Sequence, residues 1–380
     1  MESKPAISKK KKLFFSIVTT LLIFTIVLIC YAGYVAFATA KIYQSIKTNQ
    51  RGWKGNVHAA DAELGFAPIP NSEGAHVFPI GPDIPMRYDK DGFRTPMVVG
   101  VSSRPKPLVL ALGCSFTYGD AIHAEDAYPY LVGQFLNGTS KNAGVCSYGL
   151  SQMLILARKL VPIHKPDYLL VQYSPWLVER AQTPFTPSYF GKVPVPFFYE
   201  KDNSLGLYPP VFSTKTMALP VSRYRNSPAS LMDALSFYWN VGLPLSLYDD
   251  FNMLKYAFLT KMGIVPSPAA SQDKLTKYVY GEINDLAKKH GTKVVIVSLG
   301  DVSTPVVQAD RSLFPPDALL VNTHDALLER LPVANFETYV GAYAHWRGLP
   351  PVMVDSHPNE DAHRIIADVV ANKIRQSEKK

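Results

Sequence analysis

The sequence predicts an α/β protein: a three-layer α/β/α sandwich with a central parallel sheet, preceded by one N-terminal transmembrane helix. Short apolar runs such as Leu108–Leu112 stop abruptly at polar residues, which is typical of strands buried on both faces of a parallel sheet. Segments with helical apolar spacing alternate with these runs, which implies right-handed crossovers. The stretch from Leu13 to Ala40 contains no charged side chain.

This uncharged stretch exceeds the roughly 20 residues that a helix needs to cross a bilayer. Lys9 to Lys12 precede it, so the positive-inside rule places the N-terminus in the cytoplasm. We therefore expect a basic cytoplasmic tail over residues 1–12, a signal anchor over residues 13–40, and the rest of the chain outside. A cleaved signal peptide is the alternative, with a possible site at Ala38-Thr39-Ala40, but its apolar region is typically only about 7–15 residues long.

Composition excludes some classes of partner. The chain has 380 residues and a net charge of +8, and its first twelve residues hold five Lys and one Glu, so the remainder carries 8 − 4 = +4. This charge is modest, and neither an aromatic–basic repeat nor a zinc-ligand spacing accompanies it. We expect no nucleic-acid partner, no metal and no organic cofactor.

Two segments depart from the alternating pattern. Residues 41–106 are rich in Pro and Gly and contain a predicted hairpin through Asp91-Gly92, so we interpret them as a lead-in that packs on the next domain. That domain is expected over residues 107–376, with an insertion rich in Pro and aromatic residues over 176–275. The aromatic residues can form a satellite core, line a sugar or acyl site, or rest on a membrane surface.

The elements of the domain follow from the apolar spacing. The predicted strands are short apolar runs over residues 108–112, 141–145, 167–174, 293–300 and 352–354. The predicted helices have apolar residues at helical spacing over residues 126–136, 152–161, 274–290, 325–331, 335–346 and 358–374. Proline marks several boundaries: Pro129 fits a first helical turn, Pro162 ends a helix, and Pro358 begins the last one.

Polar residues with complementary chemistry follow the first and the last of these strands. Ser115 follows the first strand, and Asp355 and His357 follow the last. Because parallel strands present their carboxyl ends on one side of a sheet, the three can converge. They supply a hydroxyl, a base and a carboxylate that orients the base, as a serine nucleophile requires. The alternative is an ordinary turn at Ser115, and a nucleophilic Cys114 is a more remote option.

These residues resemble three motifs of the SGNH/GDSL hydrolase family, membrane-anchored bacterial members included. The first motif, usually Gly-Asp-Ser, is present as Gly113-Cys114-Ser115, and the second as residues 142–149. The last is present as Asp355-Ser356-His357-Pro358; alginate O-acetyltransferase-like members also separate Asp and His by one residue. The resemblance covers roughly residues 107–175 and 276–376. It implies a flavodoxin-like SGNH fold, with Ser115 as nucleophile, His357 as base and Asp355 as its orienting partner.

The resemblance also implies a set of oxyanion donors. These are the backbone N–H of Ser115 and an N–H of Ser147 or Gly149. Ser147 stands where the family has Gly, and its N–H is retained if the local backbone accommodates Ser. The family's third-motif Asn has no obvious equivalent, and Ser174 or Gln172 is the nearest polar substitute. Loss of one such donor costs roughly 10²–10³ in rate.

Other residues near the motifs have more than one interpretation. Cys114 and Cys146 lie at strand ends expected to be neighbours, so they can form a disulfide in an oxidising exterior or remain buried thiols. His123 could reach the mouth of the site, and Trp176 and Arg180 could approach the pocket; Arg180 could instead form a surface ion pair. His363 is interpreted as a surface or packing residue of the last helix.

The function that the resemblance implies is ester chemistry at the bacterial inner membrane, with the catalytic domain in the periplasm. The expected activity is that of a serine esterase acting on an ester of an envelope carbohydrate or lipid. Two alternatives stay open. One is an O-acyltransferase that modifies a cell-surface polysaccharide, and the other is a non-catalytic binding protein with the SGNH fold, which the missing Asn permits.

Overall fold

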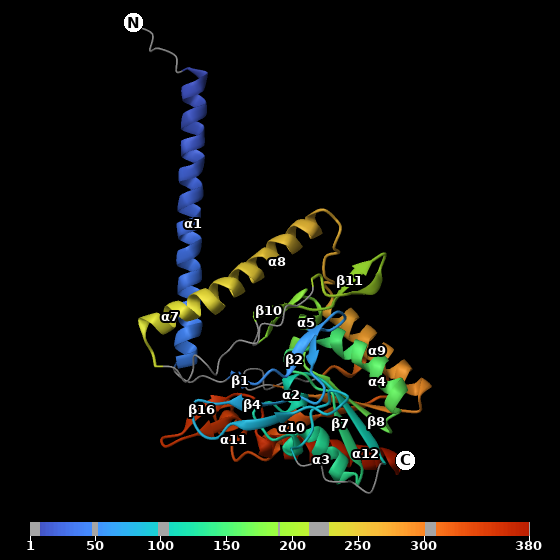
Figure 1. The fold of residues 1–380 in the computed structure, drawn as a ribbon. Helices are drawn as coiled ribbons and strands as arrows, with labels where there is room; N and C mark the ends of the chain where they lie inside the picture. The colour runs from blue at the N-terminus through green and yellow to red at the C-terminus, as the bar shows by residue number, and fades with distance from the viewer. Residues whose placement is uncertain are drawn as a thin grey trace. The chain divides into compact units, whose positions relative to one another are not determined.

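The computed structural model describes residues 8–47, 52–97, 106–188, 191–212, 228–300 and 309–379. The chain forms two compact units (Figure 1). The smaller unit joins residues 1–48 to residues 223–251, and the larger contains residues 49–222 and 252–380. The aromatic insertion is therefore shared between the two units, and its middle part belongs with the N-terminal helix.

The larger unit is built on a five-stranded sheet of order β14-β13-β8-β6-β7 in which every neighbouring pair is parallel. In chain order the strands are β6 (Leu108–Leu112), β7 (Thr139–Asn142), β8 (Tyr168–Tyr173), β13 (Lys293–Ser298) and β14 (Leu319–Asn322). The central strand β8 is buried along its whole length, as expected of a strand covered on both faces. The predicted parallel sheet is confirmed.

The prediction of residues 352–354 as the fifth parallel strand is wrong. Residues Val352–Asp355 form β16, which pairs in an antiparallel two-stranded sheet with β15 (His345–Arg347). The fifth parallel strand is β14, which was not predicted. Val352 and Met353 are 49% and 44% exposed, so β16 is not buried on both faces. A short apolar run does not by itself distinguish these two situations.

Helices cover both faces of the sheet (Figure 1). On one face lie α3 (Tyr128–Phe135), α10 (Thr323–Glu329) and α12 (Glu360–Glu378); on the other lie α4 (Leu150–His164), α5 (Pro175–Ala181) and α9 (Gln272–Lys289). Other helical segments among the described residues of this unit are α2 (Ser115–Tyr118), η1 (Ala124–Asp126), η3 (Arg311–Leu313) and α11 (Phe336–Tyr343). The predicted three-layer α/β/α sandwich is thus confirmed.

The helix predicted over residues 335–346 ends at Tyr343, and His345 and Trp346 belong to strand β15. Two further helix boundaries differ where proline was used to place them. Pro162 lies inside the last turn of α4, which ends two residues later. A proline so close to a helix end removes few backbone hydrogen bonds, so the helix tolerates it. The last helix begins after Pro358: Asn359 is its N-cap, and its side chain accepts from the N–H of Ala362.

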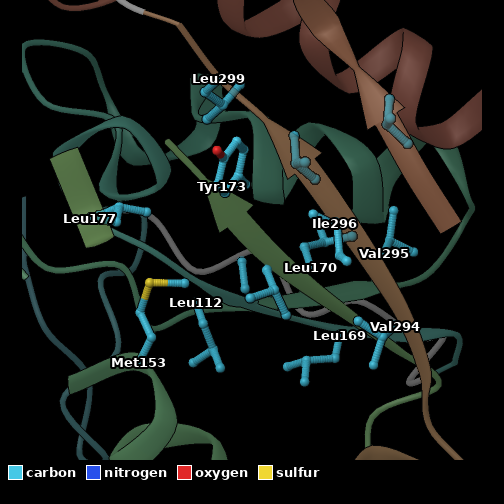
Figure 2. Close-up of a cluster of buried hydrophobic side chains, with 14 of the residues drawn as sticks. Leu112, Met153, Leu169, Leu170, Tyr173, Leu177, Val294, Val295, Ile296 and Leu299 are labelled. Carbon is cyan, nitrogen blue, oxygen red and sulfur yellow. The ribbon is translucent and has the colours of Figure 1, made fainter. Parts of the chain in front are cut away.

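One continuous apolar core lies between the sheet and its helices. Figure 2 shows part of it, with Leu170 and Ile296 on adjacent strands and Met153 contributed by α4. All three side chains are fully buried. Burial of side chains of this size contributes roughly 1.5–3 kcal/mol each.

The described part of the lead-in, residues 52–97, belongs to the larger unit. It forms a three-stranded antiparallel sheet of β1 (Gly52–Lys54), β4 (Glu73–Val77) and β5 (Ile84–Arg87), and a hairpin of β2 (His58–Asp61) and β3 (Gly65–Pro68). Its Arg94 is almost completely buried, with 1% of the residue exposed. The Arg94 guanidinium donates to the backbone oxygens of Tyr118, Gly119 and Ile122.

The insertion begins with two hairpins and continues as helices. The hairpins pair β9 (Phe185–Ser188) with β10 (Gly191–Pro194) and β11 (Phe197–Lys201) with β12 (Ser204–Tyr208). The helical part consists of α7 (Leu231–Phe237), a π-helical turn η2 (Tyr238–Gly242) and α8 (Leu243–Lys261). In the smaller unit, α7 and η2 pack on α1 (Lys9–Lys47). Within the part of the chain that the structure describes, one helix, over residues 9–44, is long and apolar enough to cross a membrane.

The core predicts a clear difference between two isoleucines. Ile296 is fully buried in β13, whereas Ile163 on α4 is 72% exposed. Ile296→Ala leaves a cavity and is expected to lower the free energy of unfolding by about 2–5 kcal/mol. Ile163→Ala is expected to change it by less than about 0.5 kcal/mol. Denaturant unfolding of the full chain in detergent measures both, and equal effects of the two changes would contradict this description of the core.

Candidate active site

The turn after β6 presents Ser115 at the carboxyl edge of the sheet. Ser115 is the first residue of α2, and its side chain is 7% exposed. A Cβ on Gly113 would clash with Thr117 Oγ1 and Gln172 Oε1, so glycine is required at this position. The turn closes at Gly119, whose φ of 80° lies in the left-handed region that favours glycine.

The structure brings together the three residues predicted to be catalytic. His357 Nε2 lies 2.9 Å from Ser115 Oγ, and His357 Nδ1 lies 2.7 Å from Asp355 Oδ1. The backbone N–H of His357 donates to the same Asp355 oxygen at 2.7 Å, which fixes the carboxylate relative to the ring. Because an ionised carboxylate only accepts, Nδ1 carries the imidazole proton and Nε2 is left to accept from the serine hydroxyl. This is the arrangement of an activated serine.

Two of the four predicted oxyanion donors keep a free N–H. Among the residues that the structure describes, no acceptor pairs with the backbone N–H of Ser115 or of Ser147. Ser147 has a φ of 68°, so this serine occupies the left-handed conformation that the family's glycine adopts readily. The segment that carries it runs beside the serine turn, since the N–H of Val145 donates to the Gly113 carbonyl at 3.1 Å.

The other two predicted donors are committed elsewhere. The N–H of Gly149 donates to Gln152 Oε1 at 2.8 Å, because Gly149 is the N-cap of α4 and the Gln152 side chain reaches back to its backbone. The Ser174 hydroxyl donates to the Leu299 carbonyl at 2.7 Å. The expectation that Gly149 or Ser174 supplies an oxyanion donor is therefore corrected.

Gln172 holds the serine turn, a role that the sequence analysis did not predict. Its Oε1 accepts from the Cys114 N–H at 3.0 Å and from the Thr117 hydroxyl at 2.8 Å. Its Nε2 donates to Ser174 Oγ at 2.9 Å. The side chain is fully buried, so these bonds have no water to compete with them. A polar residue within the otherwise apolar β8 was the signal that could have indicated this role.

A second carboxyl group faces the imidazole. Asp120 Oδ2 lies 3.9 Å from His357 Nε2, and its Oδ1 lies 3.0 Å from Nδ1 of His76 in the lead-in. The Asp120 N–H donates to the Ser115 carbonyl at 3.0 Å, which ties this carboxyl group to the serine turn. Asp120 and His76 are both almost completely buried. The sequence analysis missed both, although Asp120 follows directly after the turn glycine.

The remaining candidates are placed as follows. Trp176 contacts Phe116, which in turn lies 5.1 Å from the His357 ring, measured between centroids. Arg180 donates to the Tyr148 carbonyl at 3.1 Å, and among the described residues it has no acidic partner for the suggested surface ion pair. His123 is exposed.

His363 is a packing residue: its Nδ1 accepts from the Tyr128 N–H at 3.0 Å, and burial lowers its pKa to about 3.

The two cysteines near the site are free thiols and form no disulfide. Cys114 and Cys146 are both buried, in agreement with the alternative that the sequence analysis kept. Cys114 Sγ accepts from Gln172 Nε2 at 3.2 Å.

Three solved structures are compared with this one. The structure is similar to several solved structures. One is a member of the lipolytic protein G-D-S-L family from Veillonella parvula, with 10% identity, coverage of 72% of this chain and 98% of that chain, and a TM-score of 0.31. Another is a catalytic mutant of Axe2, an acetylxylan esterase from Geobacillus stearothermophilus, with 13% identity, coverage of 72% and 96%, and a TM-score of 0.34.

A third is LAE5, an alpha/beta hydrolase enzyme from the metagenome of Lake Arreo in Spain, with 12% identity, coverage of 72% and 97%, and a TM-score of 0.35. No protein-family model matches the chain, and no curated protein matches it. Function is therefore inferred below from the side chains of the site itself.

The bonds of Gln172 predict a cost for its removal. Gln172→Leu fills the same space but leaves the Cys114 N–H and the Thr117 hydroxyl without their buried acceptor. We expect a loss of about 1–3 kcal/mol in the free energy of unfolding. Gln134→Leu, at an exposed position of α3, is the matched control and should leave stability almost unchanged. Denaturant unfolding of both variants tests this, and a neutral Gln172→Leu would show that the amide does not hold the turn.

The burial of His363 predicts how the free energy of unfolding depends on pH. The pKa of His363 is lowered to about 3 in the folded chain, while an unfolded histidine keeps about 6.5. Between these two pKa values the unfolded chain therefore binds more protons than the folded chain. The contribution of neutral His363 to the free energy of unfolding is complete above about pH 6.5 and is lost as pH falls towards 3. Burial lowers the pKa of His58 to about 3 as well, so it adds a second, equal contribution.

His363→Asn should reduce this acid sensitivity by up to about 1.4 kcal/mol per pH unit, and His123→Asn, at an exposed position, should not. Unfolding free energies of the full chain between about pH 4 and about pH 8 measure the slope. An unchanged slope in His363→Asn would exclude His363 as one of its sources.

Proposed function

We propose that the protein is a membrane-anchored serine esterase of the SGNH type, acting outside the cytoplasmic membrane on an acyl ester of an envelope carbohydrate or lipid. The observation that carries the proposal is the pair of short hydrogen bonds that joins Ser115, His357 and Asp355. A serine hydroxyl, an imidazole and a carboxylate in this order are the components of acyl transfer through a covalent intermediate.

The proposed reaction begins when His357 Nε2 takes the proton of the Ser115 hydroxyl and Ser115 Oγ attacks the ester carbonyl carbon. Asp355 stabilises the imidazolium that forms. The N–H groups of Ser115 and Ser147 hold the negative oxygen of the tetrahedral intermediate. As this intermediate collapses, the alcohol leaves with the proton from His357, and the acyl group remains on Ser115. Water, deprotonated by His357, then releases the acid and regenerates the serine.

The proposed location rests on α1. Its apolar residues from Leu13 to Phe37 are largely exposed, and Lys9 to Lys12 precede them. Such a helix acts as a signal anchor with its basic end in the cytoplasm. The rest of the chain then lies on the outer side, where esters of the bacterial envelope are found.

Labelling with a fluorophosphonate probe tests the nucleophile. We expect the probe to modify Ser115 in the full-length protein, because the activated hydroxyl attacks phosphorus as it attacks a carbonyl. Ser115→Ala should abolish labelling, and Asp355→Asn should slow ester hydrolysis by about 10⁴ in kcat. Ser204→Ala, at the exposed first residue of β12, is the serine control and should behave as the parent. A folded parent protein that neither labels nor hydrolyses acetyl esters would favour the non-catalytic binding protein.

Hydrolysis and transfer are separated by the fate of the acyl group. With a chromogenic acetyl ester as donor, an esterase releases acetate at a rate that added polysaccharide does not change. An O-acyltransferase instead passes the acetyl group to a sugar hydroxyl, so acetylated glycan accumulates and depends on Ser115. Mass spectrometry of an added oligosaccharide detects this product. Acetylated glycan formed in preference to free acetate would replace the esterase proposal by the transferase.

A further inference from the structure

The helical part of the insertion carries a large apolar surface that the proposed reaction does not use. On α8, four exposed side chains recur at helical spacing: Leu247, Phe251, Leu254 and Phe258 are 50%, 65%, 72% and 61% exposed. At 3.6 residues per turn these four positions fall within about 60° of one another, so they form one stripe. The preceding α7 and η2 add further exposed apolar side chains: Leu231, Met232, Leu235 and Trp239. We call these eight residues the apolar face.

Contacts within the smaller unit set the direction of this segment along α1. Asp233 accepts from the Tyr43 hydroxyl at 2.7 Å and pairs with Lys47, also at 2.7 Å. Further along, Gly242 lies so close to Thr39 that any Cβ on this glycine would clash. At the far end, Asp250 accepts from the Tyr31 hydroxyl at 2.9 Å.

As the insertion proceeds from residue 233 to residue 250, its partners on α1 therefore run backwards from residue 47 to residue 31. The segment is antiparallel to α1, and the start of α8 leads towards the apolar part of that helix.

The depth of this contact follows from the length of α1. About 20 helical residues cross the hydrocarbon of a bilayer, so a span that begins at Leu13 reaches its outer edge near Tyr31. Tyr31 and Tyr34 then lie where interfacial aromatic residues gather. Because Asp250 is bonded to Tyr31, the start of α8 lies at the same level.

The charges of α8 match a lipid surface. The charged residues among its exposed positions are Lys255 and Lys261, both positive, whereas Asp249 and Asp250 are part-buried. Phe, Leu and Trp on one side, accompanied by exposed Lys, are typical of helices that lie in the interface of a membrane with anionic headgroups. The partner indicated is therefore lipid continuous with that around α1, and not a polar protein surface.

We propose that α7, η2 and α8 form a second membrane element, whose apolar face enters the boundary between headgroups and acyl chains of the outer leaflet. This inference rests on the proposed anchoring by α1 and is independent of the esterase chemistry. The apolar face and α1 together hold the chain to the membrane at two places.

Depth-dependent fluorescence of the full-length protein in vesicles of phosphatidylethanolamine and phosphatidylglycerol tests the proposal. The parent is Cys30→Ser, since the other two cysteines are buried and should not react with a label. An environment-sensitive dye is attached to Phe251→Cys or Phe258→Cys on the apolar face. Lys289→Cys, exposed on α9, is the aqueous control, and Leu22→Cys, exposed on α1, is the membrane control.

We expect the emission of dyes at residues 251 and 258 to shift to the blue. Lipids brominated near the headgroup should quench this emission, and iodide in the water should not. The dye at residue 289 should be quenched by iodide alone. If residues 251 and 258 are quenched by iodide while residue 22 resists it, the anchor holds and the second element is refuted.

If residue 22 is also open to iodide, the proposed anchor itself fails. Protection from iodide without quenching by brominated lipid would show that protein, such as a second copy of the chain, covers the face, and this too would overturn the proposal.

Discussion

The geometry of the site depends on a turn in which a strand becomes a helix without room for a side chain. At Gly113 the backbone passes so close to Thr117 and Gln172 that a methyl group would displace one of them. This closeness lets the buried amide of Gln172 accept from both the Cys114 N–H and the Thr117 hydroxyl. Ser115 is thereby held at the sheet edge with its hydroxyl turned to the imidazole. A serine on a free loop would lose this orientation to conformational entropy.

The lead-in completes the site as well as covering the sheet. Arg94 donates to three backbone carbonyls in and after the serine turn, which helps to satisfy groups that are buried there. His76 reaches Asp120, and Asp120 faces the same imidazole nitrogen as Ser115. Residues far apart in the sequence thus meet around His357, and a polar network of this kind is rigid only when its members are satisfied. The site accordingly belongs to the lead-in as much as to the three motifs.

The aromatic insertion shows how one segment can serve two purposes. Its hairpins and the second half of α8 share aromatic contacts, as between Phe185 and Tyr256, so part of it is the expected satellite core. Its helices α7 and η2 instead pack on α1, through pairs such as Tyr43 with Asp233. The two roles are compatible because successive faces of a helix can meet different surroundings.

The sequence by itself determined the parallel sheet, the flanking helices and the apolar N-terminal helix. It also indicated Ser115, Asp355 and His357 as candidates, although the parallel-strand argument for their convergence does not apply to β16. These depend on apolar periodicity and on chemistry at strand ends, both of which are local properties. Tertiary structure alone decided that Val352–Asp355 is not part of the main sheet, because local apolarity does not reveal whether a run is covered on both faces.

Tertiary structure also decided that Gly149 and Ser174 donate to partners other than a substrate oxyanion. It likewise placed Gln172, Asp120 and His76 around the three candidate catalytic residues. A hydrogen-bonding side chain has several possible partners along the chain. Only the folded backbone, by bringing distant residues within about 3 Å, selects among them.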